Sequence, residues 1–323
     1  MGVDLGQRHS ARRGAKKGAR DPAGEASEVS TELGAPLARV CRVLEAPRST
    51  AHYRRRHLQL VADGQIGQRP GPVGAIGDED LVELIRTVIT ESPFAGEGYR
   101  KIRARLRRQH NVRVSGKRVL RLLRREGLLA PQRAHRRRSK RLHEGSIVPA
   151  EPNLRWGTDG TMAWTLEDGW VWVFDLVDHY TAEAWAHVSK VGDRFAALQP
   201  IYDAVIDRHG VLAADVARGV EVRHDWGSQY RSHHFAGSLK WLGIADSPAF
   251  PGEPETNGCA ERWIKTLKEQ CLWARVYRNV DDLRQAVAAF VELYNTQWLI
   301  ERLGHRTPRE TYQDWLADKA AAA

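Results

Sequence analysis

Apolar residues recur at helical spacing through the first 130 residues of the chain. In the stretch PLARVCRVLEAPRSTAHYRRR, the large apolar side chains of residues 37–44 fall on one helical face. The pattern breaks near Pro47, and Ser49 or Thr50 can cap a second short helix. These two helices resemble a helix-turn-helix, and an ordinary helical hairpin is the open alternative.

A stretch rich in glycine and proline, residues 61–77, breaks both helix and strand and predicts a linker. Beyond it, Asp78 is placed to cap a helix. Two further apolar stripes, within 99–106 and 119–123, predict two more helices. Residues 78–131 are therefore expected to form a small helical domain.

Beyond Pro152 the pattern changes from helical spacing to runs of β-branched and aromatic residues. The run WVWVFDLV is nearly continuous, as expected for a strand that is covered on both faces. Strands are predicted for residues 155–164, 170–177, 182–188 and 219–224, and helices for residues 193–209 and 260–273. This order of elements predicts a mixed α/β domain.

The formal charge of +10 and the pI near 9.7 come from one segment of the chain. Residues 97–141 contain 18 Lys and Arg against two acids, so the rest of the chain is net acidic. Within this segment Arg118, Arg121 and Arg125 share a helical face, and we favour nucleic-acid binding over a merely solvated basic face. The stretch RAHRRRSKR, residues 133–141, is expected to lie along a DNA backbone, with a simple tether as the alternative.

The cysteines and histidines give no sign of a zinc site. The three cysteines lie in unrelated contexts without a C-x-x-C pair, which argues against both a disulfide framework and structural zinc. His233 and His234 are adjacent, a poor arrangement for sharing one metal ion. Because no run approaches 18 apolar residues, we expect neither membrane insertion nor secretion, and we expect a cytoplasmic protein.

Three acidic residues sit at the edges of predicted elements, where their side chains can converge. Asp159 lies in WGTDGT at the first strand, Asp225 follows the fourth strand in HDWGSQY, and Glu261 lies one turn into the last predicted helix. Lys265 and Lys268 share the helical face of Glu261 and can approach phosphate. Taken singly, each acid also fits a turn, an Asx-turn or a solvated helix position.

Other acidic and aromatic residues near these three acids are alternative candidates for the site. Asp175 and Asp178 lie in or at the end of the central strand, and Asp178 better fits the cap of a β-turn than a metal ligand. Trp226 and Tyr230 flank Asp225 and are candidates to contact DNA, with packing as the alternative.

The spacing of the second and third acids resembles a known signature. Asp225 and Glu261 are separated by 35 residues, as in the D,D-35-E signature of retroviral integrases and related bacterial transposases. The stretches WGTDGT, HDWGSQY, PGEPETNGCAERWIKTLKEQ and YNTQWLIERLGHRTPRE look like the motifs of that family, and GEGYRKIRARL with RVLRLLRREGL resembles the helical segment of downstream-frame transposases from two-frame bacterial insertion sequences. The departures from the pattern are Thr256, Gly258, Trp298 and Ile300.

The resemblance implies a fold, a site and a cofactor. The expected fold is α/β, a ribonuclease H-like catalytic core with a mixed sheet, preceded by small all-α segments that resemble a helix-turn-helix. Asp159, Asp225 and Glu261 are expected to hold two Mg²⁺ ions, for which Mn²⁺ can substitute. The candidate DNA-binding residues are Arg100, Lys101, Arg118, Arg121, Arg125, Arg136, Arg137, Gln229, Tyr230, Asn257, Lys265 and Lys268.

The activity that the resemblance implies is DNA transposition. The chain would bind terminal repeats of an element, nick DNA by metal-dependent hydrolysis and join strands by transesterification. The implied partners are double-stranded DNA at the ends and target, further copies of the chain on paired ends, and an upstream-frame helix-turn-helix protein, in a nucleoid-associated setting. Two rival hypotheses are a catalytically decayed end-binding repressor and a nuclease of the same fold that does not join strands.

Residues 1–30 hold few large apolar side chains, so we expect disorder there and activity without the residues before Pro36. The predicted organisation is a disordered basic segment (1–34), a helix-turn-helix-like segment (35–60), a linker (61–77), a basic helical DNA-binding domain (78–131), an Arg-rich linker (132–151), a catalytic core (152–276) and a C-terminal helical extension (277–323).

Overall fold

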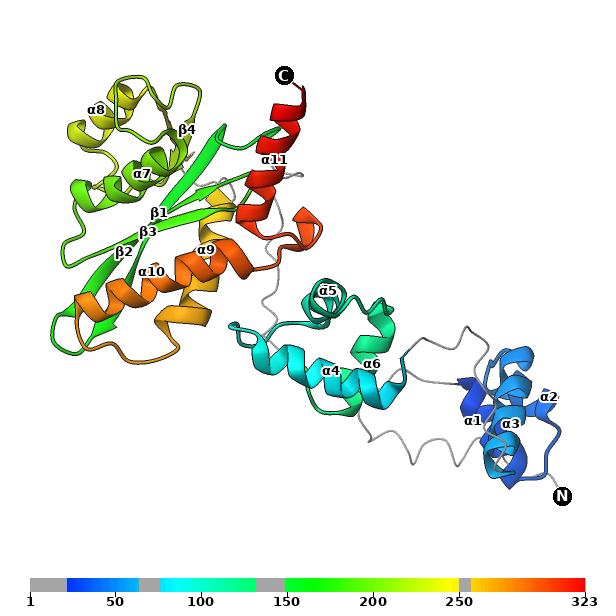
Figure 1. The fold of residues 1–323 in the computed structure, drawn as a ribbon. Coiled ribbons are helices and arrows are strands. Elements are labelled where there is room, and N and C mark those ends of the chain that lie inside the picture. The colour runs from blue at the N-terminus through cyan, green and yellow to red at the C-terminus, as the bar shows by residue number, and fades with distance from the viewer. Residues whose placement is uncertain (1–21, 64–75, 132–148, 250–256, 323) are drawn as a thin grey trace. The chain divides into compact units, whose positions relative to one another are not determined.

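The computed structural model describes residues 22–63, 76–131, 149–249 and 257–322, and its elements are shown in Figure 1. The chain divides into two compact units, Met1–Gly74 and Ala75–Ala323. None of the helices in the described ranges is both long and apolar enough to span a membrane.

The first unit contains three helices around a core of small side chains. The helices are α1 (Pro22–Glu32), α2 (Leu37–Val43) and α3 (Arg48–Ala62). The prediction of disorder is wrong for α1, because Ala23 and Ala26 are buried against the residues of α2 and α3. Because small residues let helices pack closely, α1 joins this core although its own sequence shows no stripe of large apolar residues. Removing all residues before Pro36 would therefore strip a helix from this core, and residues 1–21 lie outside the described ranges.

The second unit begins with a three-helix module. Its helices are α4 (Asp78–Glu91), α5 (Tyr99–His110) and α6 (Gly116–Arg125). Their apolar stripes meet in one core that includes Leu81, Ile102 and Leu122. The prediction that Asp78 caps α4 is wrong: Gly77 occupies the cap position, and the Asp78 carboxylate instead binds arginines of α6.

A five-stranded mixed sheet forms the centre of the remaining chain. Its strands are β1 (Arg155–Thr165), β2 (Gly169–Asp178), β3 (Ala184–Ser189), β4 (Glu221–His224) and β5 (Ala245–Pro248). The strand order is β3-β2-β1-β4-β5, with β1 to β3 antiparallel and with β4 and β5 parallel to β1. This sheet confirms the α/β fold class with a mixed sheet.

Helices cover both faces of the sheet (Figure 1). They are α7 (Arg194–His209), α8 (His233–Leu242), α9 (Gly258–Leu267), the π-helical η3 (Lys268–Leu272), α10 (Val280–Gln297), the short η4 (Glu301–Leu303) and α11 (Pro308–Ala322). Because side chains alternate along a strand, Trp156 and Phe174 face the cluster with α7 and α8, while Val171 and Val173 face the one with α9 and α10.

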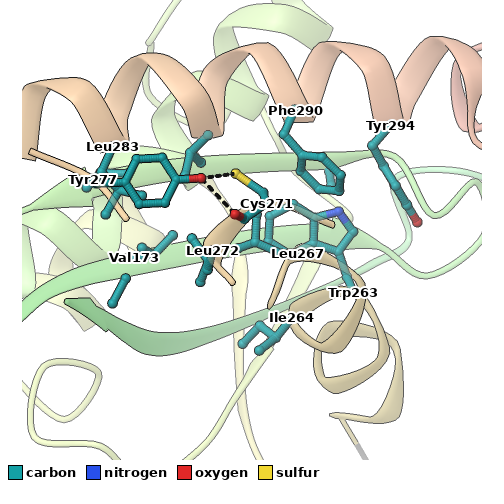
Figure 2. Close-up of a cluster of buried hydrophobic side chains, with 14 of the residues drawn as sticks. Val173, Trp263, Ile264, Leu267, Cys271, Leu272, Tyr277, Leu283, Phe290 and Tyr294 are labelled. Carbon is teal, nitrogen blue, oxygen red and sulfur yellow. Dashed lines mark hydrogen bonds between the residues drawn. The ribbon is translucent and has the colours of Figure 1, made fainter. Parts of the chain in front are cut away.

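The cluster beneath α9 and α10 fixes the helix that carries Glu261 (Figure 2). Trp263 is buried among the aromatic rings of Phe290 and Tyr294. The Tyr277 hydroxyl donates a hydrogen bond of 2.7 Å to the Cys271 carbonyl, so the end of η3 is held to the segment that follows. Burial of one face of α9 leaves Glu261 on the opposite, exposed face.

Asn295 on α10 completes the hydrogen bonding of the outer strand β3. Its side chain is 2% exposed, accepts a bond of 2.9 Å from the Ala184 N–H and donates one of 2.8 Å to the Ala184 carbonyl. We expect Asn295→Ala to lower the free energy of unfolding by about 2 kcal/mol or more, because two buried backbone groups lose their partners. Urea denaturation followed by circular dichroism measures this change. The control Gln297→Ala, at an exposed side chain of the same helix, should change it by less than about 0.5 kcal/mol; equal losses would contradict the assignment.

Candidate active site

Asp159 lies in the middle of β1, where two neighbouring strands bring other acids toward it. It is half-buried, and the Gly160 N–H donates a hydrogen bond of 2.7 Å to its Oδ1. Burial, together with the negative charges of Asp225 and Glu261, raises the pKa of Asp159 to about 6, while the Gly160 hydrogen bond and Lys268 oppose the rise. Asp225 and Glu261 therefore both lie within electrostatic reach of Asp159.

Asp225 is placed by the parallel pairing of β1 and β4. Gly157 lies beside Arg223 in this register, so Asp225 leaves β4 level with Asp159. Its carboxylate accepts a hydrogen bond of 2.9 Å from the Gly227 N–H, which makes an Asx-turn. The Asx-turn is compatible with a position of Asp225 near Asp159, because the turn fixes the direction of the exposed carboxylate.

Glu261 and two lysines extend this acidic group along one side of α9 and η3. Glu261 lies in the first turn of α9, and partial burial raises the pKa of its carboxyl group. Lys265 is exposed one turn further on, and Lys268 is half-buried at the start of η3. The predicted helix to Trp273 ends at Leu267 as an α-helix, because η3 continues it with π-helical turns.

The donor atoms of this group suit a hard cation, although they do not form a finished metal shell. Carboxylate oxygens are the ligands that Mg²⁺ and Mn²⁺ prefer. Within the described ranges, however, no three His, Cys, Asp or Glu side chains are close enough together to hold one ion. The chemistry of the residues therefore fits a divalent metal.

The raised pKa of Asp159 predicts how metal affinity depends on pH. A carboxyl group whose pKa is about 6 carries a proton below that pH, and the proton must leave before a cation binds. We expect Mn²⁺ affinity to be roughly tenfold lower at pH 5 than at pH 7.5. Electron paramagnetic resonance of Mn²⁺ measures it. Asp159→Asn should bind weakly with a flatter profile; a wild-type affinity that does not change with pH would contradict the prediction.

The two competing acids of the central strand have different surroundings. Asp178 is buried and accepts hydrogen bonds from the N–H groups of Asn153, Tyr180 and Thr181, so the predicted turn cap is confirmed. Asp175 lies directly opposite Asp159 in the β1–β2 pairing, and its carboxyl oxygens have no hydrogen-bond partner. Burial, followed by the charge of Asp159, raises the pKa of Asp175 well above its usual value.

Two residues expected to contact DNA are buried instead. Tyr230 is 1% exposed and packs edge-on against Phe174 and Phe235. Asn257 is 6% exposed, and its Nδ2 donates a hydrogen bond of 3.0 Å to the Thr158 carbonyl rather than capping α9. Neither side chain is therefore available to contact DNA. Gln229 is half-buried.

Trp226, which was also a candidate, is half exposed. Its indole N–H donates a hydrogen bond to the Ala249 carbonyl. The ring beside Asp225 therefore remains open to a DNA strand.

The basic residues predicted to grip DNA from the three-helix module are mostly paired within the chain. Arg118 and Arg121 both bind Asp78, at 2.7 Å each. Arg125 binds Glu126 at 2.9 Å, and Arg100 binds Glu301 at 3.0 Å. Apart from Glu126, which is adjacent to Arg125, these partners are distant in the chain and are not visible in the spacing of residues along one helix.

Lys101 is removed from the surface by an aromatic contact. Its Nζ lies 2.9 Å from the ring centre of Trp298, which also packs edge-on against Phe94. Burial lowers the pKa of Lys101 to about 7. Trp298, where the family motif usually has Arg, thus serves as an anchor for α5.

Other cations of the module are better placed for a polyanion. Arg107, Arg113 and Arg124 are exposed and form no ion pair with the residues that the structure describes. Spacing along one helix face does not distinguish these three arginines from the paired ones. Arg136 and Arg137 lie outside the described ranges.

Comparisons with known proteins agree with these features. The family described as "Integrase core domain" matches residues 242–308, and the family described as "HTH-like domain" matches residues 77–138. Transposase InsD for insertion element IS2A/D/F/H/I/K of Escherichia coli is 29% identical over 282 residues, which cover 84% of this chain and 89% of that protein. Transposase InsD for insertion element IS2-9 of Escherichia coli K12 is also 29% identical, with 87% of its length covered.

Solved integrase structures are also similar to this chain. The catalytic core domain of BIV integrase aligns with a TM-score of 0.37 and 19% identity, over 52% of this chain and 99% of that one. The HTLV-2 integrase catalytic core domain in complex with magnesium aligns with a TM-score of 0.38 and 17% identity, over 50% of this chain and 98% of that one. Residues 242–308 are thus similar to the integrase core domain family and residues 77–138 to the HTH-like domain family, and most of the chain is similar to the IS2 transposase InsD.

Proposed function

We propose that this protein is a DNA transposase of the D,D-35-E type, which nicks DNA at the ends of a mobile element and joins the new 3′ ends to a target. The observation that supports this proposal is that Asp225 and Glu261 lie near enough to Asp159 for their charges to raise its pKa. Similarity to transposase InsD over most of both chains supports it.

Each acid has a role in the proposed site. Asp159 on β1 and Asp225 after β4 would flank two Mg²⁺ ions, with Mn²⁺ as a substitute, and Glu261 on α9 would complete the second position. When bound, such ions lower the pKa of an attacking water or 3′-hydroxyl and stabilise the leaving oxygen. The Asx-turn of Asp225 and the buried face of α9 hold the carboxylates in place before substrate arrives.

Lysines on the same side of α9 and η3 would position the DNA. Lys268 is close enough to Asp159 to affect its pKa, so its ammonium group would lie beside a phosphodiester held at the acids. Lys265 is exposed and would contact a neighbouring phosphate. The exposed ring of Trp226 would stack on a base that is displaced at the cleaved end.

The helical segments would supply the contacts to terminal repeats. We infer that Arg107, Arg113 and Arg124 bind phosphates of the repeat, because they are exposed cations of the HTH-like domain. Two or more copies on paired ends would assemble with target DNA, with an upstream-frame helix-turn-helix protein as a further partner. The protein would then be found with the nucleoid.

The test is cleavage and strand transfer on a labelled duplex that carries the element's own terminal repeat, with Mg²⁺ or Mn²⁺. The expected result is a nick at the 3′ end of the repeat and a longer product in which that end is joined to target DNA. Binding without either product would favour the end-binding repressor. A nick without joining, also when a pre-cut end with a free 3′-hydroxyl is supplied, would favour the nuclease.

A further inference from the structure

Two arginines lie on the sheet next to the proposed catalytic acids. In the parallel pairing of β1 and β4, Arg155 lies beside Glu221 and Gly157 lies beside Arg223. Residues two apart in a strand point to the same face, so Arg223 shares a face with Glu221, and Gly157 shares one with Asp159. The side chains of Arg155 and Arg223 therefore lie on the same face of the sheet as the acids, a short distance along the strands.

The arginines have more N–H groups than partners. Arg223 is 7% exposed, and its Nε and Nη1 atoms are buried without a hydrogen-bond partner among the residues that the structure describes. Within the same residues, the Nη1 atom of Arg155 is also buried and unpartnered. Glu221 is the carboxylate that both arginines share, with a bond of 3.1 Å from Arg155 and a long one of 3.4 Å from Arg223. Buried, charged donors without acceptors are unfavourable, which points to an absent anionic acceptor.

A histidine and a third arginine lie against the same cluster. A Cβ atom on Gly157 would lie 2.7 Å from Nε2 of His179 and 2.5 Å from Oδ1 of Asn257, so both side chains lie directly over this glycine. Among the described residues, neither Nε2 of His179 nor Oδ1 of Asn257 has a hydrogen-bond partner. Arg302 donates hydrogen bonds to the carbonyls of His179 and Tyr180, which holds its positive charge close by.

The charge around this histidine is predominantly positive. After burial, the nearby arginines 155, 223 and 302 lower the pKa of His179 to about 4, and Glu221 alone among the named neighbours raises it. A neutral imidazole in its Nε2–H form is a donor to an anion, like the guanidinium groups around it. The side chains of Arg155 and Glu221 remain 19% and 28% exposed, so the cluster reaches solvent at this end.

We propose that Arg155, Arg223 and His179 form a phosphate-binding site, which takes a backbone phosphate of the DNA strand next to the one that is cut. The proposal rests on the proposed function only for the identity of the DNA. The site is distinct from Lys265 and Lys268, which lie on α9 and η3, since its arginines lie on β1 and β4 and His179 directly follows β2. It would fix the strand on the sheet side of the acids.

Binding rather than cleavage tests this site. We would measure by fluorescence anisotropy the affinity of the full chain for a terminal-repeat duplex at several salt concentrations. Arg223→Gln should weaken binding by about tenfold and reduce the salt slope by about one, because one phosphate contact is lost. The matched control is Arg218→Gln, the same change at a side chain that is 76% exposed, and it should leave both values unchanged.

Further arms separate the alternatives. Circular dichroism establishes that each variant is folded, and Arg155→Gln, at a partly exposed side chain, replaces Arg223→Gln if the latter does not fold. Equal weakening by the control, or wild-type binding by the folded Arg variants, would overturn the site.

Inorganic phosphate is tested by its effect on thermal unfolding. If the Arg variants lose that effect but bind duplex normally, the site takes free phosphate and the DNA assignment fails. If the variants lose duplex binding while wild type neither nicks nor joins, this site stands and the transposase proposal fails.

Discussion

Replacing Glu261 by Gln should reduce both nicking and joining of terminal-repeat DNA by roughly a thousandfold, equivalent to about 4 kcal/mol of transition-state stabilisation. The amide keeps the size of the side chain but removes the charge that would complete the metal site. Glu261 is exposed on α9, whose opposite face is buried, so the fold should not change. DNA affinity should stay near that of wild type, because the phosphate-binding cations remain.

The measurement uses single-turnover rates on the labelled duplex and anisotropy for binding. Glu292→Gln provides the control, since it makes the same chemical change at a helix side chain that is 64% exposed. Its rates should match those of wild type. If Glu261→Gln still joins strands at a wild-type rate, Glu261 is not a catalytic residue and the triad is wrong.

The largest effect on stability should come from Glu183, which is fully buried. Its carboxylate accepts hydrogen bonds from Arg208, whose side chain is 3% exposed, and from Arg309 at 2.6 Å. Glu183→Ala should lower the free energy of unfolding by about 3–5 kcal/mol, because the buried Arg208 guanidinium loses its buried counter-ion and keeps only the partly exposed Asp207 at 3.1 Å. Arg208 also lies 3.7 Å from the ring centre of Tyr312 on α11, so the loss should loosen that helix as well.

Urea unfolding followed by circular dichroism and tryptophan fluorescence measures the loss. Glu292 is again a suitable control, because it contacts the same Arg309 at 3.6 Å from an exposed position. Glu292→Ala should change the free energy of unfolding by less than about 0.5 kcal/mol. Similar losses in both variants would show that Arg309, rather than the buried pair with Arg208, carries the effect.

Most of the sheet could be predicted from the sequence because its signals are local. The run that forms β2 is apolar and β-branched over nearly its whole length, and the helix predicted for residues 193–209 is present as α7, with Asp193 as its N-cap. The motif spacing predicts Asp225 and Glu261 as site residues. By contrast β5, with the sequence ADSP, has no strand signal of its own and is defined by its pairing with β4. The helix α8 also escaped prediction.

The roles of single polar residues could not be predicted, because they depend on partners that are distant in the chain. Arg118 looked like a DNA-binding residue until Asp78, 40 residues away, was found to bind it. Tyr230 beside Asp225 is a candidate for DNA contact or for packing, and its ring is buried in the core with Phe174 and Phe235. Neither burial nor ion pairing is encoded in the periodicity of one helix.

The close approach at Gly157 has a consequence for how related sequences diverge. Any side chain there would collide with His179 and Asn257, two residues from different parts of the chain. A lineage that replaces this glycine must therefore shorten or reorient both neighbours in compensation. In an alignment of homologues, we expect positions 157, 179 and 257 to covary. Such correlated substitutions would show that these three residues are in contact, without any measurement on the protein itself.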